Sequence, residues 1–385
     1  MSKAKMGIGR GVRAWTAVLA GAVLSLALFA SAAQAVPATF WGVVPQAIPS
    51  QEQFQRLQRG GVDSTRVAID WSAVQPTQGG AFDWAATDSV VTKAANAGIE
   101  LLPFLNGAPK WAVPSVWVPG SGHTVKAPGH LPAAGTAASG WSNFVKGAVA
   151  RYGPNGSFWA ENPLVPPRPI RTWQVWNEPN FKYFVAKPNP AEYGKLVKLS
   201  YAALKASDAG AKLLLGGMFS RPKGGKSTTE KPKRVYFASD FLDLMYETTP
   251  GIKAKFNGVA LHPYTGKYQE LTPEIEEVRA VQKAHGDAAK PLWITELGWS
   301  SQPPPANPLL NIFAKGVAGQ AAQLKGAFSL LVSKQAKWKL QRIYWFSVDD
   351  QPGTCNFCDG SGLFCQGFVP KKSWYAYVKF SGGTP

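Results

Sequence analysis

The chain has 385 residues, with 41 basic and 23 acidic side chains, so its formal charge is +18. The length of residues 36–385 suits one large α/β barrel or two ordinary domains. After the first 35 residues no segment is long and apolar enough to cross a bilayer, which excludes a transmembrane span there.

Residues 1–35 have the order of a secretory signal peptide. A basic stretch from Lys3 to Arg13 precedes an apolar stretch from Ala14 to Ala30, and Ala33-Gln34-Ala35 supplies a small-residue cleavage site. An uncleaved N-terminal anchor is the alternative, because the apolar stretch approaches membrane-spanning length. We expect cleavage after Ala35, which predicts a secreted protein, extracellular or associated with the cell envelope.

The predicted signal carries four basic and no acidic residues, so the mature chain keeps a formal charge of +14. A charge of this size favours contact with anionic polymers. For an exported protein, an acidic polysaccharide or an anionic cell envelope is a more suitable partner than nucleic acid. The basic residues are scattered along the chain, so a generally solvated basic surface is an equally open alternative.

The three cysteines, Cys355, Cys358 and Cys365, fall in one late loop. A zinc site would need a fourth ligand, and no histidine lies nearby in the sequence. In an exported protein we expect one local disulfide and a spare thiol. Cys365 could pair with either Cys358 or Cys355, and the sequence leaves this choice open.

Strand-like and helix-like segments alternate through the mature chain. Apolar, β-prone runs predict eight strands, at Thr39–Val44, Ser64–Asp70, Glu100–Phe104, Arg171–Trp176, Lys212–Gly217, Gly258–Leu261, Leu292–Thr295 and Arg342–Phe346. Helices are predicted at Gln51–Arg59, Ser89–Ala97, Ala138–Tyr152, Pro190–Asp208, Tyr236–Tyr246, Pro273–Gly286, Ile312–Lys334 and Lys372–Phe380.

Eight strands alternating with helices predict a parallel sheet, and their number and the chain length match a (β/α)8 TIM barrel. A doubly wound open sheet is the alternative, but no Gly-x-Gly-x-x-Gly turn follows the first strand. Pro- and Gly-rich segments at Gly107–Gly135, Ser220–Lys233 and Ser301–Pro308 are expected to be rim loops. Residues 36–385 are therefore predicted to form a single domain.

Two predicted strands lead directly into a glutamate. Glu178 precedes Pro179, and Glu296 follows Thr295 and precedes a Leu-Gly loop. Parallel barrel strands place their C-terminal ends at one rim, and two carboxyl groups there are the minimum equipment for cleaving a glycosidic bond. The alternative is a structural role, such as capping a helix or pairing with arginine. Tryptophans beside both glutamates can stack on sugar rings and favour an enzyme.

The segments around these glutamates resemble clan A glycoside hydrolases. They read Val-Trp-Asn-Glu-Pro-Asn-Phe from Val175 and Ile-Thr-Glu-Leu-Gly-Trp from Ile294. Within the clan, the first segment is most similar to family 39, the group of β-xylosidases, α-L-iduronidases and bacterial exopolysaccharide hydrolases. The similarity extends over essentially the whole mature chain.

The resemblance implies roles for residues of this sequence. Glu178 would be the acid/base and Glu296 the nucleophile of a retaining mechanism. Asn177 would bind the sugar 2-hydroxyl. Arg66, on the second strand, would keep Glu296 ionised, because a nearby cation lowers the pKa of a carboxyl group.

The resemblance also places His262 and Tyr264 beside the nucleophile, and Trp345 as the floor beneath the reacting sugar. Each has a structural alternative, as a core histidine, a packing tyrosine and a barrel-filling tryptophan. From its place beside Glu296, Trp299 is a further candidate for sugar stacking. Asn106, just past the third strand, is a candidate rim contact.

The sequence therefore predicts a secreted, retaining O-glycosyl hydrolase that acts on an extracellular poly- or oligosaccharide and needs no metal or organic cofactor. Two other classes compete with this interpretation. One is a catalytically silent glycan-binding barrel, against which the presence of both glutamates argues. The other is a basic, cell-envelope-associated scaffold.

Overall fold

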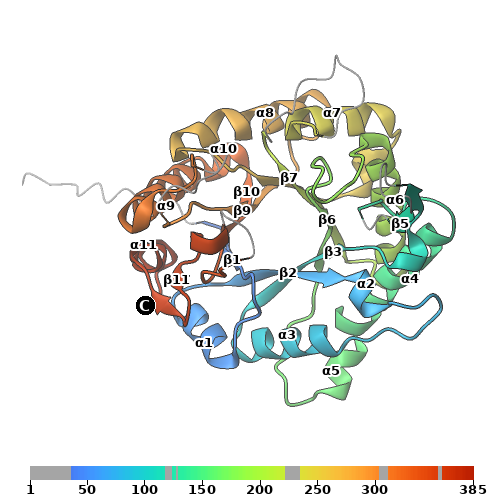
Figure 1. Cartoon of the computed structure of the whole chain (residues 1–385), viewed down its shortest axis with the longest axis horizontal. Helices are drawn as coiled ribbons and strands as arrows, with labels where there is room; N and C mark the ends of the chain where they lie inside the picture. Colours follow the sequence, from blue (N-terminus) through green and yellow to red (C-terminus); the bar gives the residue numbers. More distant parts are fainter. Residues whose placement is uncertain (1–35, 118–123, 127–128, 222–234, 303–310, 354–357) are drawn as a thin grey trace, which may run out of the picture. The chain divides into compact units, whose positions relative to one another are not determined.

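The computed structural model describes residues 36–117, 124–126, 129–221, 235–302, 311–353 and 358–385. Within these residues eight parallel strands close into a barrel, and helices surround it on the outside (Figure 1). The order around the barrel is β1-β10-β9-β8-β7-β6-β3-β2. The predicted TIM barrel is thus confirmed, and the open sheet is not formed.

The barrel strands match the predicted ones closely. They are β1 Trp41–Val44, β2 Ser64–Asp70, β3 Glu100–Asn106, β6 Thr172–Asn177, β7 Lys212–Phe219, β8 Val259–His262, β9 Leu292–Leu297 and β10 Leu340–Phe346. Two small antiparallel sheets lie outside the barrel, pairing β4 Ser115–Trp117 with β5 Thr124–Lys126 and β11 Phe364–Cys365 with β12 Val369–Pro370.

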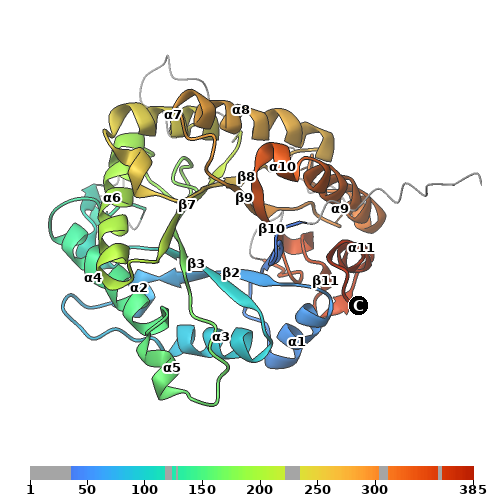
Figure 2. The ribbon, with the colours of Figure 1, turned by 180° about the vertical axis from the view of Figure 1, so that it is seen from behind.

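The helices form the outer ring, which Figure 2 shows from behind. They are α1 Gln51–Arg59, α2 Trp71–Val74, α3 Ala85–Asn96, α4 Gly135–Tyr152, α5 Ser157–Glu161, α6 Pro190–Ser207, α7 Ala238–Thr248, α8 Leu271–Ala284, α9 Gly316–Ser333, α10 Gln335–Trp338 and α11 Lys372–Ser381. Short 3-10 turns occur at Lys110–Ala112, Ile252–Lys255, Tyr268–Glu270 and Cys358–Gly360.

Local chemistry explains where two of the helices begin. At α1, Gln53 N donates to Ser50 Oγ at 3.2 Å and Ser50 N donates to Gln53 Oε1 at 2.8 Å, which together form a capping box. The helix α9 begins four residues later than predicted. Backbone hydrogen bonds from Ser300 N to Phe313 O and from Lys315 N to Ser300 O hold residues 313–315 against the end of β9.

Alternating strand residues divide the core into two parts. Outward-facing side chains pack against the helices, whereas Val44, Leu102, Leu214, Ala260, Trp293, Tyr344 and Phe346 form a separate apolar cluster inside the barrel. Ala68 shares the inner face of β2 with Arg66, yet it is exposed to solvent. The barrel is therefore open above Arg66.

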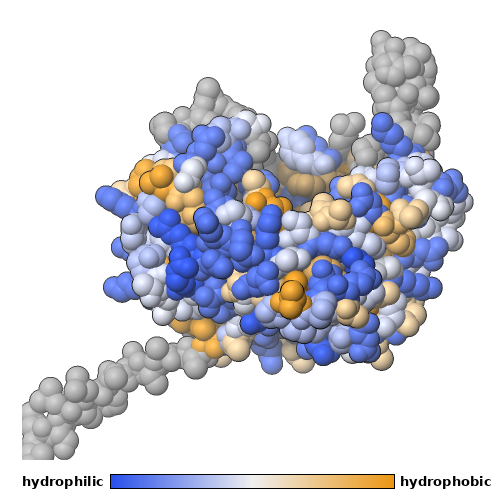
Figure 3. Space-filling model, turned by 90° about the horizontal axis from the view of Figure 1, so that it is seen from below, coloured by the Kyte–Doolittle hydropathy of each residue, from blue (hydrophilic) through white to orange (hydrophobic). Residues whose placement is uncertain are grey.

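The molecular surface carries mainly hydrophilic residues on the face shown in Figure 3, with small separate apolar patches. Among the described helices, none combines the length and the apolar character that crossing a membrane requires.

The predicted disulfide is not formed at Cys365, which is a free cysteine on the surface. Both expected pairs required this residue. Its side chain lies on the exposed side of the short strand β11, so it faces solvent. Cys355 lies outside the described residues.

Candidate active site

The end of β6 carries Asn177 and Glu178, and its backbone departs from regular strand geometry there. Trp176 and Glu178 have φ angles of +70° and +42°. Val175 and Trp176 both pack into the outer core, so the next two residues, Asn177 and Glu178, both turn toward the barrel interior. Left-handed backbone at non-glycine residues costs about 1–3 kcal/mol each and is typical of functional sites.

A bulge in β9 places Glu296 at the same rim. The pairing with β10 shifts between Ile294 and Leu297, because two residues of β9 lie opposite one residue of β10. Thr295 and Glu296 therefore both face the interior, where they contact His262 and Arg66 respectively. Such bulges redirect side chains next to active sites.

Arg66 ties the two strand ends together from β2. Its side chain is fully buried, and Nη1 donates to Glu296 Oε1 while Nη2 donates to Asn177 Oδ1, each at 2.6 Å. Its Nε donates to Gln174 Oε1 at 2.6 Å, and the guanidinium lies 4.0 Å from the centre of the Phe104 ring. All guanidinium nitrogens are thus engaged, and the orientation of Glu296 is fixed.

His262 and Tyr264 contact the two carboxyl groups from the end of β8. His262 Nδ1 lies 2.8 Å from Glu178 Oε1 and 3.6 Å from Glu296 Oε2, and its Nε2 lies 2.9 Å from Thr295 Oγ1. Tyr264 donates its hydroxyl hydrogen to Glu296 Oε2 at 2.7 Å. Within the described part of the chain, Glu178 Oε2 makes no hydrogen bond, which leaves it for a leaving-group oxygen.

The two carboxyl groups are close to each other. One oxygen of Glu178, one of Glu296 and a ring nitrogen of His262 all lie within 4.8 Å of one another. Retaining glycosidases hold their carboxyl groups about 5–5.5 Å apart, whereas inverting enzymes need about 6.5–9.5 Å for an intervening water. The separation therefore suits direct attack on the anomeric carbon.

The same three residues could also supply ligand atoms to a metal ion, since carboxylate oxygens and imidazole nitrogen are common ligands. Arg66, however, donates to Glu296 from 2.6 Å. This cation disfavours a second positive charge beside the same carboxylate, so the cluster is better suited to proton transfer and nucleophilic attack.

The environment gives the two glutamates different acidities. Burial, followed by the charge of Glu296, raises the pKa of Glu178 well above its usual value, and Arg66 opposes this only in part. Burial also raises the pKa of Glu296, but the Arg66 charge and the hydrogen bonds from Tyr264 and Arg66 oppose that rise. Glu178 is thus the better proton donor and Glu296 the better anion.

The neighbouring groups stay neutral. Burial, and then the charge of Arg66, lower the pKa of His262 well below its usual value. Burial and the charge of Glu296 raise the pKa of Tyr264, so its hydroxyl keeps its proton and remains a hydrogen-bond donor to Glu296.

The structure brings six of the predicted site residues together, namely Arg66, Asn177, Glu178, His262, Tyr264 and Glu296. Asn106, at the end of β3, pairs in register with Asp70, and its Oδ1 is buried without a hydrogen-bond partner among the described residues. Within this part of the chain, Asn106 therefore has an unused acceptor at the C-terminal end of its strand.

Trp345 and Trp299 do not reach the site, which corrects the prediction for both. Each is fully buried, and their rings pack together 6.1 Å apart in the outer core. Trp345 donates Nε1–H to Ser361 O, and Trp299 donates to Thr265 O. Strand alternation is the physical reason for Trp345, because the inward residue beside it is Phe346.

Gln174, Thr295 and Phe104 belong to the site but were not predicted. Gln174 accepts from Arg66 and donates to Leu215 O at 3.0 Å, while Phe104 lies against the guanidinium. Gln174 and Thr295 are polar residues within otherwise apolar strands. That pattern was a usable signal, since a buried polar side chain requires a partner.

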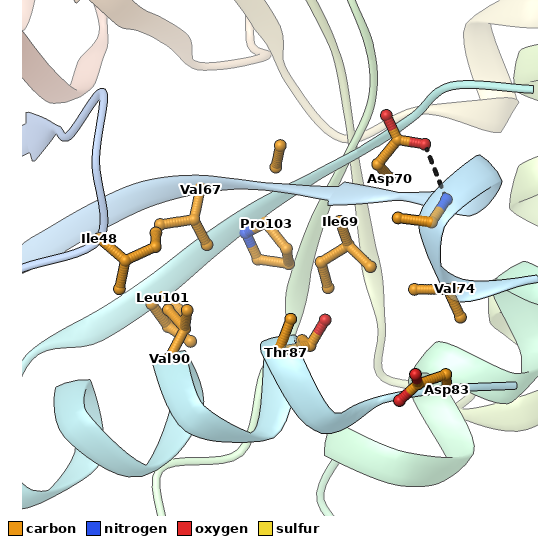
Figure 4. A pocket seen from close by; sticks show the side chains of 13 residues that line it. Ile48, Val67, Ile69, Asp70, Val74, Asp83, Thr87, Val90, Leu101 and Pro103 are labelled. Atoms are coloured by element: carbon orange, nitrogen blue, oxygen red, sulfur yellow. Dashed lines mark hydrogen bonds between the residues drawn. The ribbon is translucent and has the colours of Figure 1, made fainter.

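A separate cavity of about 240 Å³ lies between the barrel strands and α3 (Figure 4). Its lining includes Val67, Ile69, Val90 and Leu101. At one end Asp70 accepts from Ala73 N at 3.3 Å, shown by the dashed line. This cavity contains neither glutamate, so it is distinct from the carboxyl pair.

The fold and the paired carboxyl groups define a glycoside hydrolase barrel. The family model described as the glycosyl hydrolase catalytic core matches residues 159–364, more than half of the chain. The chain belongs to this family, and its identification as a clan A glycoside hydrolase is confirmed.

Three relatives illustrate the similarity. A β-xylosidase of Geobacillus stearothermophilus is 28% identical over 232 residues, which are 55% of this chain and 42% of that protein. The chain thus spans less than half the length of this relative. A family 39 glycoside hydrolase from Bacteroides cellulosilyticus WH2 has a TM-score of 0.61 at 20% identity, covering 91% of this chain and 64% of that one. A family 39 β-xylosidase from Caulobacter crescentus has the same TM-score and identity, covering 91% and 73%. The two solved structures share the barrel fold.

Proposed function

We propose that this protein is a secreted, retaining O-glycosyl hydrolase that cleaves an extracellular poly- or oligosaccharide by double displacement. The observation that carries the proposal is the pair of buried carboxyl groups, which offer oxygens within 4.8 Å of each other in unequal surroundings. A glycan-binding barrel without catalytic activity would not need these two groups. It would need neither a buried Glu296 paired with an arginine nor a nearby Glu178 that keeps its proton.

The proposed reaction follows from these positions. Glu296 attacks the anomeric carbon, and Glu178 gives its proton to the departing glycosidic oxygen. A glycosyl ester on Glu296 and a free alcohol result. Glu178, now ionised, takes a proton from a water molecule as the water oxygen attacks the anomeric carbon. The bond from this carbon to Glu296 breaks, which regenerates the Glu296 carboxylate and releases the sugar with its original anomeric configuration. Asn177, held by Arg66, would bind the 2-hydroxyl.

We further propose an acidic polysaccharide as the substrate, made available by secretion of the mature chain. Its charge of +14 supports this, and so does the loop that follows Glu178. That loop carries exposed Lys182 and Lys187 and no acidic residue before Glu192. A neutral β-glycan such as xylan is the competing substrate, favoured by the similarity to a β-xylosidase.

The test begins with the mature chain on a panel of aryl glycosides, neutral xylans and uronate-containing glycans, at low and high salt. Proton NMR of the first-formed product should show retention of the anomeric configuration. Inverted product would refute double displacement, and an absence of turnover on the whole panel would refute the enzyme. Preference for neutral glycans with no effect of salt would refute the acidic substrate, because exposed charge interactions weaken with ionic strength.

A further inference from the structure

A row of aromatic rings leads from the nucleophile to the protein surface. We call Tyr264, Phe219, Phe181 and Tyr183 the aromatic row. Successive ring centres are 5.6, 5.3 and 4.8 Å apart. Tyr264 donates its hydrogen bond to Glu296 at the inner end. At the outer end the residue Tyr183 is 76% exposed, whereas the other three are partly buried.

The outer half of the row is continuous with the proposed acid. Phe181 and Tyr183 lie in the loop that follows Glu178, and Phe181 N donates to Glu178 O at 2.9 Å. In a glycosidase the acid faces the leaving group, because it protonates the departing oxygen. Rings on the loop beside the acid therefore lie on the leaving-group side of the scissile bond.

Hydrogen bonds fix this loop against the barrel. Asn180 is fully buried, and its Nδ2 donates to Phe219 O at 2.8 Å and to Tyr236 O at 2.9 Å. Its Oδ1 accepts from Phe219 N at 3.1 Å. The rings of Phe181 and Phe219 are thus carried on segments held in register, and a preorganised platform binds with less ordering cost.

The exposure of Tyr183 distinguishes a binding platform from ordinary packing. Aromatic side chains that only fill a core have little exposed surface, whereas Tyr183 and the adjacent Phe184 are both exposed. Neighbouring exposed apolar side chains bordered by polar residues mark an interaction site. Lys182 Nζ lies 5.6 Å from the centre of the Tyr183 ring, so the outer end also presents a cation. Flat rings that border a charged group suit the apolar faces of sugar units.

We propose that the outer half of the aromatic row, Phe181 and Tyr183, is a leaving-group-side subsite that binds the sugar units released with the glycosidic oxygen. This inference rests on the proposed glycosidase function and refines it, because it makes the substrate a chain extending past the scissile bond on that side. Tyr183 is the outermost contact. Removing its ring should weaken binding of oligosaccharides and leave substrates with a small leaving group unaffected.

The experiment compares wild type with Tyr183→Ala, Tyr183→Phe and Tyr375→Ala. Tyr375 is the matched control, since it is 53% exposed on α11. For each protein kcat/KM is measured on a nitrophenyl glycoside and on oligosaccharides of increasing length. The first probes are nitrophenyl β-xyloside and the series from xylobiose to xylohexaose. The sugar that wild type cleaves in the panel above replaces xylose if it differs.

Tyr183→Ala should lower kcat/KM on the longer oligosaccharides about three- to tenfold, the range for loss of one aromatic contact. Its value on the nitrophenyl glycoside should equal that of wild type. Tyr183→Phe and Tyr375→Ala should match wild type on both substrates. Equal kcat/KM values for Tyr183→Ala and wild type on every oligosaccharide would overturn the subsite while leaving the glycosidase intact. Wild type that cleaves neither substrate class would instead refute the proposed function, and the subsite with it.

Discussion

Replacement of Arg66 by methionine is the sharpest test of how this site would keep Glu296, the proposed nucleophile, ionised. The guanidinium contacts Glu296 Oε1 at 2.6 Å in a fully buried setting. For charge centres about 4 Å apart and an effective dielectric constant of about 20, the attraction is roughly 4 kcal/mol. Losing it removes the main influence that opposes the effect of burial on the pKa of Glu296.

The expected result is a pH-dependent loss of activity. Without the cation the pKa of Glu296 rises, so less of the carboxylate is ionised at a given pH. The acidic limb of the kcat/KM profile on an aryl glycoside should therefore move to higher pH. We expect kcat/KM near pH 6 to fall by about two to three orders of magnitude, since each 1.4 kcal/mol corresponds to about tenfold.

Two controls separate this effect from unfolding. Breaking a buried ion pair can cost about 3–5 kcal/mol of stability, so urea unfolding must first show that Arg66→Met is folded at assay temperature. Arg66→Lys keeps the positive charge but cannot reach all three acceptors, so it should lose activity without an equal movement of the acidic limb. A folded Arg66→Met whose acidic limb stays at the wild-type pH would refute the reasoning.

Three further predictions concern the carboxyl groups. Glu296→Gln should abolish turnover on every substrate. Glu178→Gln should keep activity on substrates with good leaving groups and accumulate a glycosyl-enzyme detectable by intact mass. Equal losses for both variants on all substrates would contradict these roles. The pKa of Glu178 is raised in the folded protein, so this carboxyl group ionises at lower pH in the unfolded chain than in the folded one. As pH rises above the ordinary carboxyl pKa, ionisation of Glu178 therefore stabilises the unfolded state and lowers the free energy of unfolding of the wild type. The free energy of unfolding of Glu178→Gln, measured with urea relative to wild type, should therefore be higher at pH 8 than at pH 4.5 by at least about 1 kcal/mol. The same difference between variant and wild type at both pH values would contradict the raised pKa. Removing divalent ions with EDTA should leave kcat/KM unchanged, because Arg66 already compensates Glu296; activity lost with EDTA and restored by zinc would show a metal centre.

Most of the fold was predictable because the spacing of apolar residues differs between strand and helix segments along the whole chain. The predicted bounds of Ser64–Asp70 and Gln51–Arg59 are those observed, since each follows from local pattern and capping. The positions of Glu178 and Glu296 were likewise indicated by apolar strands that end in a carboxyl group.

The parts that could not be predicted depend on departures from regular geometry and on loops. The bulge in β9 and the left-handed backbone at Trp176 decide which neighbours face inward, and neither has a distinct sequence signature here. Strict alternation along β10 would have excluded Trp345, because Tyr344 and Phe346 take the inner face. The position of Phe181 depends on a loop fixed by tertiary hydrogen bonds of Asn180, to which local sequence gives no access.

The contacts of Arg66 also bear on how the polypeptide would acquire the proposed hydrolase activity. The partners Gln174 and Glu296 are separated from it by 108 and 230 positions in the chain. Contacts between such distant segments form late, because closing long loops costs entropy before the contact stabilises them. A nascent chain that lacks β9 leaves the arginine without its carboxylate, and a barrel missing one strand cannot orient the nucleophile. Glycoside hydrolysis that appears during refolding would therefore report closure of the barrel. Partly assembled forms would not hydrolyse glycans.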